Sequence, residues 1–335
     1  MRSFLLSSRR IQGAPARFAV LLLAALLYAA RAGSSGAAEG AVPSQESSAA
    51  QPGSEQLPTA VDLRPAFREW KLSPRRQGAR PTCSAFTVAG ALEYAAAKCQ
   101  GHGTRLSVEF LNWAANQVRG DTNDGGFFSD LWRGYAAYGI AVEKEMPYQA
   151  QFDPTRSPSA AALADAKSRL DLGLRLHWIK KWNVHTGLTD EHMTRIKRTL
   201  SRGWPVCGGF RWPKQEAWVS DVLQMCPSNA VRDGHSVLLV GYRDDAAQPG
   251  GGVFLFRNTA RNGWDGYMPY TFAQAYMNDA VWVDYASRTN SRASTSAPAP
   301  LFCDPLEAWT AHLMNLPSLS GIPVRMKMFC VVGNR

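Results

Sequence analysis

The sequence lacks the features that define several large classes of protein. Charged residues make up only 19% of its 335 residues, against 45% hydrophobic residues, which excludes a wholly disordered chain or a long coiled coil. It has no CxxC pair and no cysteines at zinc-finger spacing with histidine, so neither a metal ion nor another cofactor is expected. The formal charge of +10 includes no long run of Lys or Arg. Five of the 37 basic residues lie in the first 32 positions, and the remaining 32 face 27 acidic residues, which does not favour a nucleic-acid partner.

The N-terminus has the order of a targeting segment. Its apolar run, residues 18–30, is shorter than the about 20 residues needed to span a bilayer. It follows several arginines and precedes Ala-Arg-Ala at 30–32, the pattern of a secretory signal peptide. We therefore expect residues 1–32 to be a cleaved signal peptide and the mature protein to be secreted or periplasmic, without a stable membrane span. An uncleaved N-terminal membrane anchor is the alternative.

Two stretches of small and polar residues divide the rest of the chain. Residues 33–57 and 286–300 contain almost no large apolar side chain, which predicts two flexible linkers. Between them, residues 58–285 are the predicted main domain. Residues 301–335 combine a helix pattern with an alternating strand pattern and are expected to form a C-terminal appendage of unknown role.

An exported chain favours disulfides over free thiols. The six cysteines are Cys83, Cys99, Cys207, Cys226, Cys303 and Cys330. We expect Cys303 to pair with Cys330 within the appendage, because they flank one short segment. Cys207 and Cys226 are the next expected pair, and Cys99 is expected to stay unpaired.

Helical patterns come first in the main domain and strand patterns second. Residues 83–99 are almost all apolar or small, which predicts a helix buried on most of its surface. Further predicted helices are one capped by Ser107, one over 129–138 and one over 189–203. Predicted strands cover 205–210, 236–242, 253–257 and 280–283. This order predicts an α+β fold with two segregated halves.

One segment places a thiol where a helix begins. In QGARPTCSAFT, residues 77–87, Cys83 stands at the start of the buried helix, and the positive end of a helix dipole favours the nucleophilic thiolate. Gln77 offers a carboxamide N–H that, with the backbone N–H of Cys83, could stabilise an oxyanion. The alternative is an inert structural cysteine.

A histidine and an asparagine complete this chemistry. His235 stands just before an apolar strand, and Asn258 ends the next one. If the two strands are neighbours, the Asn258 carbonyl can accept a hydrogen bond from the imidazole and fix its tautomer. Cys83, His235 and Asn258 would then be the nucleophile, the base and the residue that orients the base.

Together these segments resemble the papain-like cysteine peptidases, in which about 150 residues separate the nucleophile from the histidine. The matching segments, in the order of the family, are VDLR at 61–64, QG…CSAF at 77–86, LSVEFLNW at 106–113, DGG at 124–126, GHSVLLVGY at 234–242 and NTARNGWDGY at 258–267. The resemblance covers about residues 61–285. It implies a two-subdomain fold, with a helical left half, an antiparallel β-barrel-like right half and the active-site cleft between them.

The resemblance also implies a role for seven residues. Four are catalytic: Cys83 as nucleophile, His235 as general base and acid, Asn258 as orienter and Gln77 as oxyanion donor. Three bind substrate: Gly125, Gly126 and Trp264, the last also shielding the His–Asn pair. The implied function is an exported cysteine peptidase that hydrolyses peptide or protein substrates through a thioester acyl-enzyme.

Several positions depart from the family pattern. Arg80 replaces the first cysteine of the family's CGSCW segment, so the disulfide made there is absent, and Pro81 and Thr82 replace its Gly and Ser. Ser84 and Ala260 replace two tryptophans, the second of which covers the asparagine, so we expect Asn258 to be more hydrated. These changes keep two alternatives open: an inactive relative that binds peptides or partners, and a cell-wall amidase or transamidase using the same triad.

Overall fold

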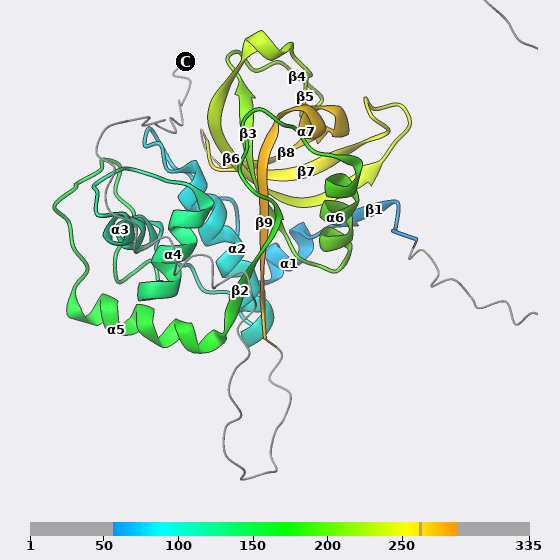
Figure 1. Ribbon diagram of the computed structural model, residues 1–335. Helices are drawn as coiled ribbons and strands as arrows, with labels where there is room; N and C mark the ends of the chain where they lie inside the picture. The colour runs from blue at the N-terminus through cyan, green and yellow to red at the C-terminus, as the bar shows by residue number, and fades with distance from the viewer. Residues whose placement is uncertain (1–55, 261–262, 287–335) are drawn as a thin grey trace, which may run out of the picture. The chain divides into compact units, whose positions relative to one another are not determined.

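Helices dominate the first part of the chain and strands the second (Figure 1). The computed structural model of the protein describes residues 56–260 and 263–286. The helices are α1 (Arg64–Glu69), α2 (Cys83–Gln100), α3 (Val108–Arg119), α4 (Phe128–Tyr138), α5 (Ala160–Ser168), α6 (Asp190–Ser201) and α7 (Tyr270–Tyr276), with 3₁₀ turns at Arg169–Leu172 and Ser228–Ala230. The strands are β1 (Ala60–Asp62), β2 (Leu174–Lys180), β3 (Val206–Pro213), β4 (Trp218–Val219), β5 (Val222–Leu223), β6 (Val231–Asp244), β7 (Gly252–Asn258), β8 (Trp264–Pro269) and β9 (Met277–Tyr285). The expected α+β class is confirmed.

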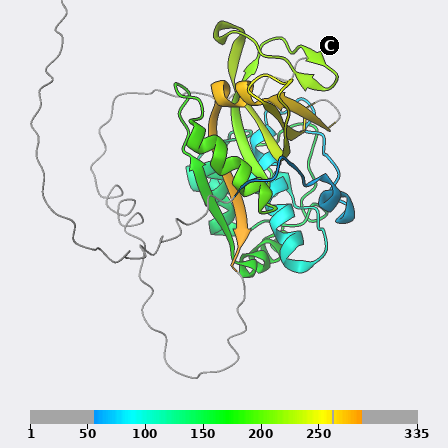
Figure 2. The same ribbon diagram turned by 90° about the vertical axis from the view of Figure 1, so that its right-hand side faces the viewer.

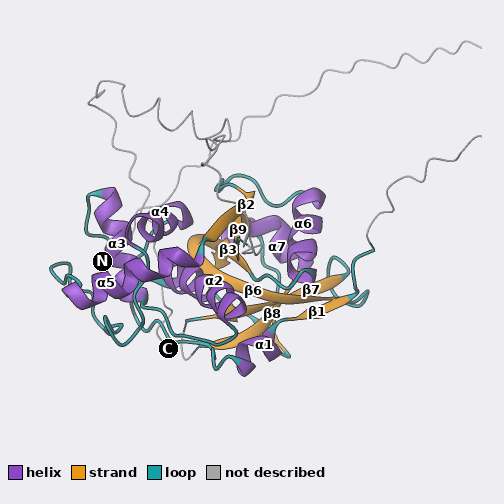
Figure 3. Ribbon diagram, turned by 90° about the horizontal axis from the view of Figure 1, so that it is seen from below, coloured by secondary structure: helices purple, strands orange, loops and turns teal. Residues whose placement is uncertain are grey.

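Helix α2 lies between the helical half and the sheet (Figure 3). All but four of its 18 residues are buried, as its apolar sequence predicts, because α3 and α4 pack on one side and β6 and β9 on the other. Gly90 allows the close approach to the sheet: a Cβ there would lie 3.3 Å from the Leu238 side chain of β6. The helix ends at Gly101, which adopts a left-handed conformation and closes the last turn with its backbone N–H.

The strands in the described part of the chain form one nine-stranded sheet. Its order is β2-β9-β3-β6-β7-β8-β5-β4, and β1 pairs with β6. Every neighbouring pair is antiparallel, as expected, except the parallel pair β5–β8. Figures 1 and 2 show β9 running beside β2 at the boundary with the helices. Helices α6 and α7 pack against the strands, so the second half has its own core.

Two predictions about cysteines can be compared with the structure. Cys99 is a free, exposed thiol, as predicted. The Cys207–Cys226 pairing is wrong, since both are free. The reason is orientation: Cys207 faces α2, with its Sγ 3.6 Å from the Thr87 carbonyl oxygen, whereas Cys226 lies in the segment after β5 and accepts a hydrogen bond from Tyr276 through its own carbonyl.

Three predictions lie outside the described residues: the signal peptide, the C-terminal appendage with its Cys303–Cys330 pair, and the two linkers. Of the linkers, only residues 56–57 and residue 286 are described. Within the described part, none of the helices combines the length and apolar character needed to cross a membrane.

Candidate active site

Cys83 is the first residue of α2 and is buried between the helix and the start of the apolar part of β6. Its Sγ lies 3.9 Å from the carbonyl oxygen of Gly234, the residue before His235. The first turn of α2 carries no acidic side chain, so the unpaired backbone N–H groups there are the nearest source of partial positive charge on the helix. The fold therefore brings the sulfur atom of Cys83 to the same place as the predicted base.

His235 and Asn258 meet across neighbouring strands. β6 pairs with β7, and the His235 Nε2 atom lies 3.1 Å from Asn258 Oδ1. The same Oδ1 atom accepts the backbone N–H of Ala260 at 3.0 Å, which identifies it as the oxygen of the carboxamide. Nε2 must therefore be the protonated nitrogen that donates to Asn258. Nδ1 is then the nitrogen that remains able to accept a proton.

The surroundings of His235 keep its imidazole neutral at pH 7. Burial lowers its pKa to about 4, and the hydrogen bond with Asn258 opposes this shift only in part. The Trp212 ring packs edge-on against the imidazole, with 4.6 Å between ring centroids. A neutral imidazole with a fixed tautomer is the form that can take a proton from a thiol.

Trp264 lies beside Asn258 in the sheet. In the β7–β8 register Trp264 is the direct partner of Asn258, and its ring packs edge-on against Trp218 at 4.7 Å. The expectation that Ala260 leaves Asn258 hydrated is wrong, because Asn258 is only 1% exposed. The carboxamide oxygen of Asn258 accepts hydrogen bonds from both His235 and the backbone N–H of Ala260. The backbone at position 260 therefore binds Asn258 although the tryptophan side chain is missing there.

Gln77 is held in one orientation by its neighbours. Its Oε1 accepts the hydroxyl proton of Thr259 at 2.7 Å, and one Nε2–H donates to the Arg80 carbonyl at 2.9 Å. Its backbone N–H donates to the Thr259 carbonyl, and its own carbonyl accepts the Tyr148 hydroxyl proton at 2.8 Å. A carboxamide has two N–H donors, and these contacts use one of them. The second is the group that could stabilise an oxyanion.

The two glycines predicted to bind substrate differ in what their backbones do. Gly125 has φ +90°, and a Cβ there would lie 2.3 Å from the Pro81 carbonyl oxygen, so only glycine fits. Its N–H donates to Asn112 Oδ1 at 2.8 Å and is therefore used within the protein. Within the described part of the chain, the N–H of Gly126 makes only a long 3.4 Å contact to Ser84 Oγ. Of the two amides, that of Gly126 is thus the weakly bound one.

Sequence reasoning missed the role of three residues that hold these groups in place. Thr259 directly follows Asn258 and binds Gln77. Thr82 donates its hydroxyl proton to Tyr148, whose own proton goes to the Gln77 carbonyl. Arg80 is only 4% exposed, and the signal that could have revealed it is a lone charge within the otherwise uncharged segment 77–87.

A second group of buried polar atoms lies in one row across three strands. Gly209 of β3 pairs with Ser236 on one side and with Asp279 on the other. Ser236 Oγ and Asp279 Oδ1 are buried without a hydrogen-bond partner among the described residues. Burial raises the pKa of Asp279 to about 7, and the charge of Lys180 opposes the shift. Asp279 is therefore a carboxyl group whose protonation differs between the folded and the unfolded chain.

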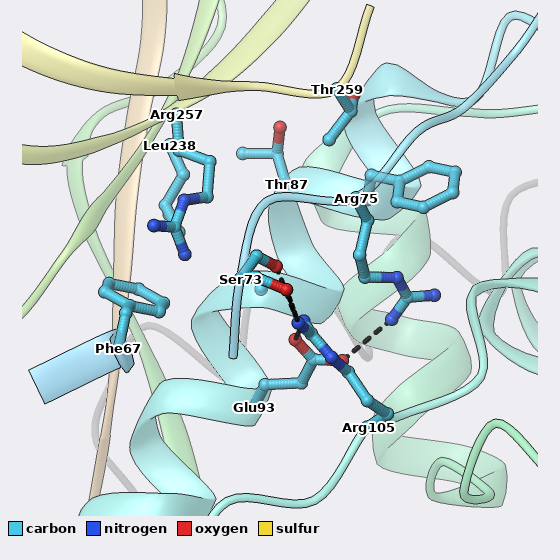
Figure 4. A pocket seen from close by; sticks show the side chains of 11 residues that line it. Phe67, Ser73, Arg75, Thr87, Glu93, Arg105, Leu238, Arg257 and Thr259 are labelled. Carbon is cyan, nitrogen blue, oxygen red and sulfur yellow. Dashed lines mark hydrogen bonds and ion pairs between the residues drawn. The ribbon is translucent and has the colours of Figure 1, made fainter. Parts of the chain in front are cut away.

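A small cavity lies beside Thr259, the residue whose hydroxyl binds Gln77 (Figure 4). It measures about 20 Å³, enough for one water molecule, and Thr259 forms part of its wall. The buried Glu93 carboxylate of α2 accepts from Arg75 at 2.7 Å and from Arg105 at 3.2 Å, and Arg105 also donates to Ser73. These contacts fasten the segment that leads to Gln77 onto α2. Among the described residues no group of three or more side chains is arranged to hold a metal ion.

Much of the chain is similar in sequence to a known protein family and to known proteins. A sequence model of the family described as "Papain family cysteine protease" matches residues 57–280. The chain is 26% identical over 252 residues to Cysteine proteinase 2 of Zea mays, covering 72% of this chain and 65% of that protein. It is 27% identical over 228 residues to thiol protease aleurain of Arabidopsis thaliana, covering 66% and 58%. The chain thus spans less than two thirds of the length of these relatives.

Solved structures show the same fold. Xylellain, a cysteine protease from Xylella fastidiosa, superimposes with a TM-score of 0.52 at 23% identity, over 69% of this chain and 87% of that one. The Amb a 11 cysteine protease of ragweed pollen, in its proform, gives a TM-score of 0.50 at 18% identity, over 70% and 69%. The expected two-subdomain architecture, helices in one half and a mainly antiparallel sheet in the other, is confirmed.

Proposed function

Because the chain belongs to the papain family of cysteine proteases, we propose that it is a cysteine peptidase that hydrolyses peptide bonds through Cys83, His235 and Asn258. The observation that carries the proposal is the 3.1 Å contact between His235 Nε2 and Asn258 Oδ1, formed beside the start of the helix that bears Cys83. It leaves Nδ1 as the proton acceptor. Gln77 supplies the oxyanion donor.

The first half of the reaction forms an acyl-enzyme. His235 Nδ1 takes the proton of the Cys83 thiol, and the thiolate attacks the carbonyl carbon of the substrate. The carbonyl oxygen becomes an oxyanion, which accepts from the second Nε2–H of Gln77 and from the Cys83 backbone N–H. The imidazolium then gives its proton to the leaving amine nitrogen as the C–N bond breaks. The product is a thioester between Cys83 and the acyl part of the substrate.

The second half regenerates the thiol. His235, again neutral, takes a proton from a water molecule, whose oxygen attacks the thioester carbonyl. The C–S bond breaks, the carboxylic acid leaves, and the proton returns to the Cys83 sulfur. Asn258 keeps Nε2 protonated throughout, so the same nitrogen, Nδ1, handles every proton.

The other assignments are proposals of the same kind. Gly125, Gly126 and Trp264 are proposed to line the site for an extended peptide substrate, with Gly126 offering the amide and Trp264 shielding Asn258. The N-terminal sequence supports export, through a signal peptide over residues 1–32, of a peptidase domain over residues 58–285.

The test is loss of hydrolysis in folded variants. Cys83→Ala and His235→Ala are each expected to abolish cleavage of a peptide substrate while keeping the thermal unfolding midpoint close to that of the wild type. Cys99→Ala is the matched control, because it removes an exposed thiol at the other end of the same helix. Full activity in folded Cys83→Ala protein would refute the mechanism.

A further inference from the structure

Arg80 combines a buried guanidinium with a backbone carbonyl that binds the proposed oxyanion donor. Nη1 and Nη2 donate to the two oxygens of Glu109 at 2.6 and 3.1 Å, which anchors the side chain to α3. Nη1 also donates to the Gln149 carbonyl at 2.8 Å. The guanidinium carbon lies 4.4 Å from the centre of the Tyr148 ring. The side chain therefore has partners on several separate segments of the helical half.

The remaining contacts of Arg80 are with Asp124, in the loop that contains Gly125 and Gly126. Nη2 donates to Asp124 Oδ1 at 2.8 Å and Nε donates to Asp124 Oδ2 at 3.0 Å, a bidentate pair at a carboxylate that is only 11% exposed. Asp124 directly precedes Gly125, whose Cα approaches the Pro81 carbonyl so closely that no side chain fits. The ion pair and this backbone contact join the loop that carries Gln77 to the loop proposed to hold the substrate.

Charge in this cluster is balanced. Arg80 pairs with two carboxylates, Glu109 and Asp124, and Arg156 Nη1 lies 3.9 Å from Glu109 Oε2. Two cations thus face two anions, and a fully paired buried cluster fixes geometry more than it adds net stability.

We propose that Arg80 is a positioning residue for the oxyanion site: its guanidinium, clamped by Glu109 and Asp124, fixes the backbone at position 80, whose carbonyl aims the carboxamide of Gln77. This inference rests on the proposed peptidase function. The link is the 2.9 Å hydrogen bond from Gln77 Nε2 to the Arg80 carbonyl. That bond takes one N–H and so sets the direction of the other.

Binding Glu109 and Asp124 at the same time requires the several N–H donors of a guanidinium. Lysine keeps the charge but has a single ammonium nitrogen, which cannot bind both oxygens of Glu109 and both of Asp124 at these distances. Arg80→Lys is therefore expected to loosen the backbone without removing the buried charge. Loss of an oxyanion donor lowers kcat by about 10²–10³-fold, so partial misplacement of that donor is expected to lower it by about 10-fold.

The decisive experiment is a double-mutant cycle on kcat with Arg80→Lys, Gln77→Ala and the double variant. If Arg80 acts through Gln77, the double variant has the kcat of Gln77→Ala alone, and KM changes less than about twofold in Arg80→Lys. Alkylation of Cys83 by iodoacetamide needs no oxyanion donor, so its rate is expected to match the wild type in all three variants. Asp124→Asn, which removes a charge and keeps the shape, serves as a second variant should Arg80→Lys fold poorly, and its cycle with Gln77→Ala is expected to give the same pattern.

The matched control is Arg169→Lys, the same change at an arginine that is paired with Asp165 in the α5 segment. Its kcat and KM are expected to equal those of the wild type. Effects of Arg80→Lys and Gln77→Ala that multiply in the double variant, or a wild-type kcat in Arg80→Lys, would overturn the inference alone. A fall in Cys83 alkylation that parallels the fall in kcat would also overturn it. A wild-type chain without Cys83-dependent hydrolysis would overturn the proposed function and the inference with it.

Discussion

Asn258→Ala removes the acceptor on which the orientation of His235 depends. The change deletes the oxygen that lies 3.1 Å from His235 Nε2 and 3.0 Å from the Ala260 N–H. Asn258 is only 1% exposed, so bulk water does not freely replace it. A buried donor left without a partner costs about 1–3 kcal/mol. At about 1.4 kcal/mol for each factor of ten, kcat/KM is expected to fall by about 5- to 150-fold.

Asn258→Asp keeps the orientation of the His235 imidazole but adds a negative charge next to it. A carboxylate can accept from both donors, so the tautomer of His235 is retained. Its negative charge favours the imidazolium, which raises the His235 pKa from the value of about 4 that burial imposes. Since the base acts in its neutral form, the acid limb of kcat/KM moves to higher pH.

The assay is the pH profile of kcat/KM for a fluorogenic peptide, with Asn229→Asp as control because it adds the same charge at an exposed position in the same half. The wild type and the control are expected to share an acid limb near pH 4. The reasoning is refuted if Asn258→Ala matches the complete loss of Cys83→Ala, or if Asn258→Asp leaves the acid limb in place.

Four further predictions concern individual residues. Gln77→Ala is expected to lower kcat by about 10²-fold with little change in KM, and an effect confined to KM would exclude an oxyanion role. Ala260→Trp is expected to leave activity unchanged, because Asn258 is already covered, and a large loss in a folded variant would show a differently built pocket. Asp279 keeps its proton in the folded chain up to about pH 7 but loses it near pH 4 when unfolded, so its contribution to the free energy of unfolding falls by up to about 4 kcal/mol as pH rises from 4 to 7. Asp279→Asn is expected to remove that part of the pH dependence in denaturant titrations, and an unchanged slope would contradict the buried, protonated carboxyl. Mass mapping of a non-reduced digest is expected to link Cys303 to Cys330, and a link from Cys303 to the main domain would overturn the appendage prediction.

Long periodic segments were predictable from the sequence because their patterns report burial directly. The apolar run that starts at Cys83 became α2, and the strand expected at 236–242 lies inside β6. β2 and β8 were missed. In β2 (LRLHWIK), which lies at the edge of the sheet next to β9, apolar residues alternate with basic ones. β8 (WDGYMP) contains glycine, aspartate and proline, which are rare in strands.

Side chains that hold other side chains were not predictable in the same way. The proximity of His235 and Asn258 followed from two neighbouring strands, but the prediction that His235 precedes its strand was wrong, because β6 begins at Val231 and His235 pairs with Phe210 of β3. The role of Thr259 depends on a hydrogen bond to a residue 182 positions away, and that of Arg80 on carboxylates 29 and 44 positions away. Nothing in local spacing reports such contacts. The cysteine pairing failed for the same reason, since the direction in which Cys207 points is set by the packing of β3 against α2.

The most direct test of the account is covalent labelling of the native protein with a peptidyl chloromethyl ketone, followed by intact mass and peptide mapping. The account predicts one adduct per chain, located on Cys83, with complete loss of hydrolysis and with the exposed Cys99 unmodified. It also predicts no adduct in folded His235→Ala protein on the same time scale. Modification of Cys99 while hydrolysis persists, or an active protein that never labels at Cys83, would contradict it.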